Sequence, residues 1–199
     1  MARHREFDEE KALAGALEVF WQRGYSAAGM QELCAAMGLN PGSVYGAYGN
    51  KHDLFIAAMR RYLEDVTREG IDRIAAAPTG REGIRSYFDY LTEGIVSGRR
   101  QWGCLGTNAF MEMADRDDTV QTIMKEHFDK LEVAFREALE RDRADLPCRL
   151  EPVDFARYLV CVAQGLNVLS KTAPDRQKLN GIVDAAMLPV TALEEDCVR

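Results

Sequence analysis

The chain has 199 residues, of which 47% are hydrophobic, so it can bury one substantial core or two smaller ones. Its five cysteines form no CxxC pair and have no regular spacing, which excludes a disulfide framework and a zinc cluster and indicates a reducing, cytoplasmic setting. The net charge of −7 excludes a protein whose whole surface binds nucleic acid, although a single suitable face would be enough for such contact.

Two helices are predicted before residue 40. The apolar spacing is helical along the whole chain, which predicts an all-α fold without strands. Asp8 is a candidate N-cap and Gly24 a candidate residue just after the C-terminus, which places the first helix at about residues 8–23. A second, short helix ends at Gly38 and is indicated by four apolar residues at helical spacing: Met30, Leu33, Cys34 and Met37.

The stretch GLNPGSVYGAYGNK, residues 38–51, predicts the start of a third helix. Asn40 suits the N-cap and Pro41 the first helical position, where the missing N–H costs nothing. Val44 and Tyr48 are expected to point inward. The opposite face carries small or hydroxylated residues that allow close contact: Gly42, Ser43, Tyr45 and Gly46. Two short helices joined by a glycine-containing turn predict a helix-turn-helix whose second helix enters the major groove, with a plain helical hairpin as the alternative.

A fourth helix is predicted after Asn50, which forms a capping-box pattern with Asp53. Lys51 then lies in the first helical turn, where a positive charge opposes the helix dipole but, beside free backbone N–H groups, favours a phosphate contact. Residues 1–61 carry seven basic and seven acidic residues, and Glu32 is the only charged residue between Arg23 and Lys51. This balance distinguishes the N-terminal segment from the acidic remainder of the chain.

A specific set of features lies between residues 8 and 55: the Phe20-x-x-x-Gly24-Tyr25 helix end, the Gly38-Leu39-Asn40 turn, Gly42, Val44-Tyr45, Tyr48 and Lys51-x-x-Leu54-Phe55. This set resembles the N-terminal DNA-binding domain of the TetR family of transcriptional repressors. The resemblance implies a homodimer on double-stranded DNA at an inverted-repeat operator, and a C-terminal bundle whose small-molecule effector loosens DNA binding. Carried across residue by residue, the resemblance implies DNA contacts at Asn40, Gly42, Ser43, Tyr45 and Lys51, with Lys51 and Tyr45 on phosphates. We add three residues of the same helix to the candidate DNA contacts: Pro41, Gly46 and Tyr48.

Three features depart from the family pattern, one of them being that the aromatic residue at the end of the third helix is Tyr48 rather than Phe. Ala28-Gly29 stands where the family usually has Thr-Thr or Thr-Ser, so a hydroxyl cap and a phosphate contact are missing, and Ala47 stands where His or Tyr is usual. The N-terminal arm with Arg3 and Arg5 can compensate by reaching a neighbouring groove or the DNA backbone, as homeodomain arms do. A disordered tail is the alternative interpretation of the arm.

The rest of the chain predicts five further helices, about nine in total: residues 82–98, Cys104 to Met113, 118–143, 152–171 and 175–194. The break AAAPTGREG separates the long fourth helix from the fifth. We therefore divide the chain into a helix-turn-helix domain with its arm, residues 1–55, and a helical domain for ligand binding and dimerisation, residues 56–199.

The last two predicted helices are candidates for the dimer interface. Apolar residues mark one face of the first helix and one side of the second: Phe155, Leu159, Val162, Leu166, Leu169, Ile182 and Ala186. Two such helices per subunit would pair as a four-helix interface, which the resemblance favours. The alternative is that these residues form the core of a single chain.

A ligand pocket needs a mostly apolar lining with a few polar groups, and the middle helices supply such residues. The candidates are Tyr62, Phe88, Leu91, Trp102, Cys104, Asn108, Met111, His127 and Phe128. Each could instead be an ordinary core residue. Cys104 lies between glycines near a predicted helix start with Arg99 and Arg100 close by, a setting that lowers a thiol pKa. The resemblance adds that Gly-Cys-Leu recurs in family members that respond to electrophiles, so a thiol sensor is one alternative and a buried core thiol the other.

The sequence predicts no enzyme chemistry, no cofactor and no metal site. Asp115, Asp117, Thr119 and Glu126 match positions of an EF-hand loop, but Val120 replaces the required glycine, which excludes calcium binding there. No apolar run is long enough to cross a bilayer. A helical-bundle enzyme would need inward pairs of titratable groups, which are missing, and a protein adaptor would show no salt-dependent affinity for DNA.

Overall fold

The computed structural model describes residues 8–146 and 150–191, which form helices and no strands. Their α-helices are α1 (Glu9–Ala27), α2 (Met30–Met37), α3 (Pro41–Tyr48), α4 (Lys51–Ala76), α5 (Gly80–Val96), α6 (Leu105–Met113), α7 (Asp118–Arg141), α8 (Pro152–Leu169) and α9 (Arg176–Thr191). Single 3-10 turns follow α7 and α8, at Arg143–Asp145 and Ser170–Thr172. The predicted all-α fold is confirmed.

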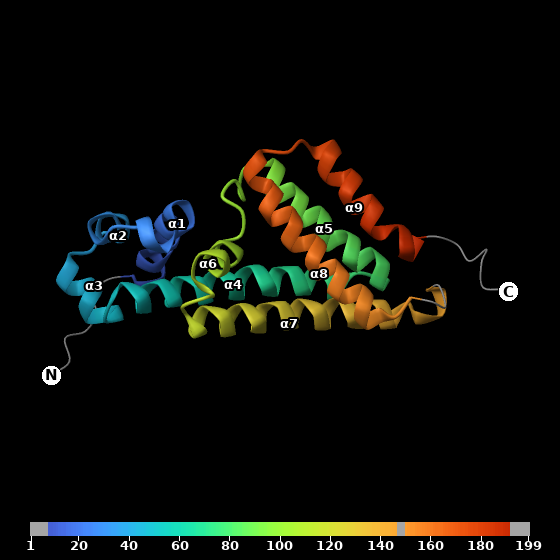
Figure 1. The fold of residues 1–199 in the computed structure, drawn as a ribbon, viewed down its shortest axis with the longest axis horizontal. Helices are drawn as coiled ribbons and strands as arrows, with labels where there is room; N and C mark the ends of the chain where they lie inside the picture. The colour runs from blue at the N-terminus through green and yellow to red at the C-terminus, as the bar shows by residue number, and fades with distance from the viewer. Residues whose placement is uncertain (1–7, 147–149, 192–199) are drawn as a thin grey trace.

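Two long helices connect the ends of an elongated molecule. Figure 1 shows α1, α2 and α3 gathered at one end and α5, α8 and α9 at the other, with α4 and α7 running side by side along the length. α4 has 26 residues and therefore spans roughly 39 Å at about 1.5 Å per residue. No helix of the described residues has both the length and the apolar composition to cross a membrane.

The helix starts follow the capping residues predicted from the sequence. The side chains of Asp8, Asn40 and Asn50 each accept a hydrogen bond from the backbone N–H three residues further on, at the starts of α1, α3 and α4. Gly38 has a φ of 66° and ends α2 in the left-handed conformation, where glycine is favoured because it lacks a Cβ.

The bounds of α1 differ from the prediction. Gly24 interrupts the helix with a φ of 77° and a ψ of 174°, but helical structure resumes after it, and α1 ends at Ala27 rather than at residue 23. The later helices begin or end within about two residues of the predicted positions. The predicted end of the last helix, residue 194, lies outside the described residues.

The apolar side chains form two cores. The first joins α1, α2, α3 and the beginning of α4 to α6 and the beginning of α7, and Phe20, Phe55 and Met124 are fully buried in it. The second joins α5, α8 and α9 to the end of α4 and to α7, around Phe88 and Phe135, whose rings stack with centroids 5.9 Å apart. α6 therefore packs with the N-terminal helices, although it lies well beyond residue 55.

The face predicted to form the dimer interface lies mostly inside the single chain. Four of its seven residues are at most 8% exposed: Phe155, Leu159, Leu166 and Ala186. The other three are half-buried: Val162, Leu169 and Ile182. The prediction is corrected for the four buried residues, because apolar periodicity shows that a helix face is covered but not whether its own chain or a partner covers it.

Candidate nucleic-acid interface

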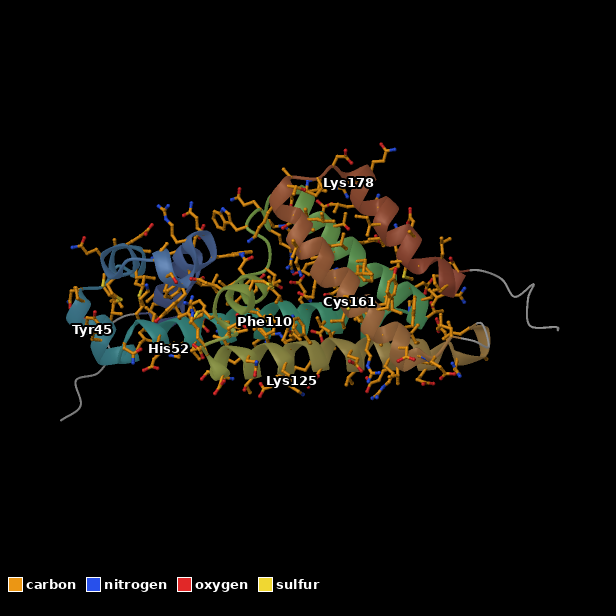
Figure 2. All side chains as sticks on the ribbon, in the orientation of Figure 1. Tyr45, His52, Phe110, Lys125, Cys161 and Lys178 are labelled. Atoms are coloured by element: carbon orange, nitrogen blue, oxygen red, sulfur yellow. The ribbon has the colours of Figure 1, made fainter. Side chains whose placement is uncertain are left out.

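α3 presents an exposed surface with small side chains at one end of the molecule. Figure 2 places Tyr45 at this end, where its side chain is 48% exposed. Asn40, Pro41, Gly42 and Gly46 are also exposed, and Ser43 is partly so. Because glycines carry no side chain, another molecule can approach the backbone of α3 closely between Asn40 and Tyr45.

The opposite side of α3 fixes the orientation of the helix. Val44 is 1% exposed, and Tyr48, one helical turn later, packs against the same core. The hydroxyl oxygen of Tyr48 is enclosed by protein, so the prediction that Tyr48 contacts DNA is corrected. Residues four apart share one face of a helix, which assigns Tyr48 to the buried side together with Val44.

Lys51 lies in the first turn of α4, beside the end of α1. Its ammonium is 4.7 Å from the centre of the Tyr25 ring and 3.5 Å from the Ser26 carbonyl oxygen. An aromatic face and a carbonyl oxygen both attract a cation, so these contacts restrict a side chain that would otherwise be mobile. A restricted lysine loses less conformational entropy when it binds a phosphate.

The surface around α2 carries little net charge. Glu32 pairs with Arg23 at 3.2 Å, so the one acidic residue between Arg23 and Lys51 is neutralised where it would repel a phosphate. Gly29 occupies the N-cap position of α2 without a side-chain hydrogen bond, which agrees with the missing hydroxyl cap. Arg3 and Arg5 lie outside the described residues, so the role of the arm stays a prediction.

Comparison with known proteins identifies the family. Residues 12–58 match the family described as bacterial regulatory proteins, tetR family. Over 190 residues the chain is 30% identical to the uncharacterized HTH-type transcriptional regulator YezE of Bacillus subtilis (strain 168). The aligned region covers 94% of this chain and 98% of YezE. The chain belongs to the TetR family. It is therefore a DNA-binding transcriptional regulator, as the resemblance implied.

Solved structures share the fold along nearly the whole chain. A cysteine mutant of the TetR family regulator CifR, in complex with 26-bp double-strand operator DNA, aligns with a TM-score of 0.83 at 31% identity and covers 93% of this chain and 98% of its own. The reduced form of NemR from E. coli aligns with a TM-score of 0.78 and the same coverage. Its identity of 21% supports the fold alone.

The residues predicted to line a ligand pocket do not meet in one cavity. Four are buried in the interior: Tyr62, Phe88, Leu91 and Cys104. Three line a cleft of about 630 Å³ between α1, α6 and α8: Trp102, Asn108 and Met111. His127 lines a different cleft, of about 430 Å³, between α4 and α7, and Phe128 is half-buried. The sequence could not distinguish these sites, because the nine residues come from distant parts of the chain and local spacing does not show which of them meet in space.

Cys104 is buried at the start of α6, in the position of a structural residue. It occupies the N-cap position of α6 and is 3% exposed. An enclosed thiol packs as a small hydrophobic group and is shielded from reagents in solution. The geometry thus supports the interpretation of Cys104 as a core residue over that of a thiol sensor.

Hydrogen bonds that join α6 and the turn before it to α1 were not indicated by the sequence. Trp21 Nε1 donates to the Gly103 carbonyl oxygen at 3.0 Å, and Glu112 accepts hydrogen bonds from the backbone at the end of α1. These partners are more than 80 residues apart in the chain, so no local pattern predicts them. The one available signal is the acidic Glu112 in the last turn of α6, where a negative charge is unfavourable to the helix dipole.

Acidification is expected to destabilise the protein through His127. Its ring is buried with Nδ1 2.7 Å from Thr67 Oγ1, and burial lowers its pKa to about 4. The unfolded chain binds a proton near the ordinary pKa of about 6.5 whereas the folded chain does not, so stability falls as the pH drops from about 6.5 towards 4. The loss should reach about 2 kcal/mol by about pH 5, measured as the change in urea unfolding free energy between neutral and acidic buffer.

The matched variant for this effect is His127→Gln, which keeps a hydrogen-bonding side chain but does not titrate. Its unfolding free energy should change little across the same range of pH. Carboxylates change the unfolding free energy mainly below about pH 4.5, so they do not obscure the comparison between the two proteins. An equal loss of stability in both proteins would contradict the assignment to His127.

Proposed function

We propose that the protein is a cytoplasmic repressor that binds an inverted-repeat operator as a homodimer and leaves it when a small molecule binds the C-terminal bundle. The exposed face of α3 carries this proposal, because its small residues permit close contact while Val44 anchors the helix in the first core. The DNA-binding unit would be residues 1–55, and residues 56–199 would provide the dimer interface and most of the effector site, whose remaining wall is the end of α1. The similarity to CifR bound to operator DNA supports the proposal.

The proposed DNA contacts divide into two kinds. Six lie on the exposed side of α3 and its cap, where they would face the major groove: Asn40, Pro41, Gly42, Ser43, Tyr45 and Gly46. Lys51 would contact a phosphate beside them, together with the Tyr45 hydroxyl. Base edges in the groove carry the sequence information, whereas phosphate contacts set position and most of the affinity.

The phosphate role of Lys51 is tested by Lys51→Ala. DNA affinity should fall for every duplex sequence, and the slope of log affinity against log salt concentration should decrease in magnitude by about one unit, because one fewer counterion is released. Fluorescence anisotropy with a labelled random-sequence duplex, repeated over a series of potassium chloride concentrations, measures both quantities.

Lys125→Ala provides the matched control. Lys125 is a lysine on α7, paired with Asp129 at 2.7 Å, and Figure 2 shows it far from Tyr45. Its removal should leave the salt slope unchanged. A slope that Lys51→Ala leaves as steep as in the unmodified protein would refute the phosphate contact of Lys51.

The proposed dimer interface is the outer side of α8 and α9, next to the buried side predicted from the sequence. Its exposed residues are Tyr158, Cys161, Gly165 and Val168 on α8, and Gly181, Ala185 and Leu188 on α9. Val168 is 55% exposed and Leu188 63% exposed, so this side offers apolar surface that a second copy would cover in a dimer. The small residues between them would allow two copies to approach closely about a two-fold axis.

The proposed effector site is the cleft of about 630 Å³ between α1, α6 and α8. The rings of Trp21 and Trp102 lie 5.8 Å apart, edge to face, and Met111 is 79% exposed beside them. Asn108 and Lys171 add polar groups. Such a lining suits an apolar or aromatic molecule with a polar substituent.

A further inference from the structure

The chain turns sharply at residues 24–26, where α1 meets α6. Gly24 breaks the helix with its positive φ of 77°, and the next two backbone N–H groups, of Tyr25 and Ser26, point to a side chain instead of the preceding helical turn. Glu112 Oε2 accepts from Tyr25 at 2.9 Å, and Glu112 Oε1 accepts from Ser26 at 2.8 Å. One carboxylate on α6 therefore satisfies two adjacent amides of α1.

The contact depends on the backbone conformation of Gly24 and on the negative charge of Glu112. The positive φ of Gly24 favours glycine at this position, and a Cβ there would lie 2.8 Å from Glu112 Oε2, so the carboxylate would have to shift. Burial alone would raise the pKa of Glu112, but the hydrogen bonds from Ser26 and Tyr25 outweigh it and hold the pKa below its ordinary value. Glu112 is thus an anion at neutral pH, and hydrogen bonds to a charged acceptor are stronger than neutral ones.

The segment that Glu112 holds is the same segment that supports Lys51. The Lys51 ammonium lies 4.7 Å from the centre of the Tyr25 ring and 3.5 Å from the Ser26 carbonyl oxygen. The amide side of Tyr25 and Ser26 faces Glu112, and their ring and carbonyl face Lys51. A short chain of contacts therefore runs from α6 to the proposed phosphate-binding residue.

A second carboxylate holds the next residue of α4. Asp117 Oδ2 lies 2.6 Å from His52 Nε2, and Asp117 Oδ1 accepts from the backbone N–H groups of Thr119 and Val120 at the start of α7. The His52 ring meets the Tyr25 ring edge to face, with centroids 6.2 Å apart. Figure 2 places His52 on α4 near the end that carries α3. The end of α1 and the start of α4 are therefore both held by residues in α6 and at the start of α7.

We propose that Glu112 and Asp117 are positioning residues for DNA binding, which fix Lys51 and the helix-turn-helix relative to α6 and the start of α7. The inference rests on the proposed function. Glu112 also lines the cleft proposed for the effector, so a displacement of α6 by an occupant of the cleft would reach Lys51 through the contacts of Tyr25 and Ser26.

The test combines Glu112→Ala and Glu112→Gln with Lys51→Ala in a double-mutant cycle. Binding to a random-sequence duplex and to duplexes selected from a random pool is measured at several salt concentrations. Glu112→Ala should weaken binding about tenfold or more, and Glu112→Gln, which keeps one acceptor oxygen, by a smaller factor. Lys51→Ala should have a smaller effect in the Glu112→Ala background than alone, because a misplaced lysine contributes less. The amide NMR signals of Tyr25 and Ser26 should shift in both Glu112 variants.

Asp115→Asn is the matched control, since it removes an exposed carboxylate of the same region that has no hydrogen bond or ion pair to the described residues. It should leave affinity and the two amide signals unchanged.

If Glu112→Ala does not fold, the cycle is completed with Glu112→Gln, which has nearly the same size as glutamate. Additive effects of the two substitutions, or unchanged affinity despite shifted amide signals, would overturn the inference while leaving the proposed function intact. Failure of the unmodified protein to bind any duplex at low salt would overturn both.

Discussion

Gly15→Ala is expected to destabilise the protein by about 3 kcal/mol and to abolish its DNA binding. At this position α1 crosses α2, and a Cβ would lie 2.3 Å from the carbonyl oxygen of Ala36. The obstacle is backbone, so no side-chain rotation can relieve the clash, and the two helices must move apart. Overpacking of this kind costs about 1–3 kcal/mol or more, and the separation would open the first core around Phe20 and Leu33. Urea unfolding followed by circular dichroism measures the loss.

Gly46→Ala is the control for this substitution, because it adds the same methyl group to another helical glycine of the helix-turn-helix. No atom lies within 4 Å of the Cβ that would be added, and alanine is favoured over glycine in a helix by up to about 1 kcal/mol. The fold should therefore be as stable as before or more so. Equal unfolding midpoints for Gly15→Ala and the unmodified protein would contradict the close approach of α1 and α2.

Val168→Asp is expected to convert the proposed dimer into monomers. Val168 is 55% exposed near the C-terminal end of α8, on the outer face assigned to the partner, and two-fold symmetry would bring the substitution into the interface twice. A buried carboxylate without a partner costs several kcal/mol, so the dissociation constant of the dimer should rise by a factor of about a thousand or more. Sedimentation velocity at micromolar concentration separates the two states, and DNA affinity should fall with the loss of the second recognition helix.

Val133→Asp tests whether any exposed apolar position would give the same result. Val133 is 41% exposed on α7, outside the residues assigned to the interface, and its replacement should leave the sedimentation coefficient unchanged. A protein that stays dimeric with Val168→Asp would show that the outer face of α8 is not the dimer interface.

The sequence predicted the helix-turn-helix well because local rules decide its form. Asp8, Asn40 and Asn50 cap their helices with side chains that reach only three residues along the chain, and Gly38 ends α2 because it adopts a positive φ. Tyr48 is the exception. Its spacing from Val44 already indicated the buried side, although it was also among the candidate DNA contacts.

The C-terminal half was predicted less well because its decisive contacts are distant in sequence. The spacing of Phe155 and Leu159 correctly indicated a covered face, but the covering side chains come from the same chain. The cleft residues Trp102 and Met111 could not be separated from His127, which lies at another cleft. Glu112 was missed because its partners in α1 are 86 and 87 residues away.

The central claim is that the protein binds an inverted-repeat DNA site as a dimer, and selection from a random duplex pool tests it most directly. The protein is titrated against the pool at a series of salt concentrations, the recovered sites are sequenced, and the mass of the protein–DNA complex is determined. We expect enrichment of an inverted repeat, a complex that contains an even number of subunits, and an affinity that falls steeply with salt. The absence of an enriched sequence, with no binding even at low salt, would contradict the claim.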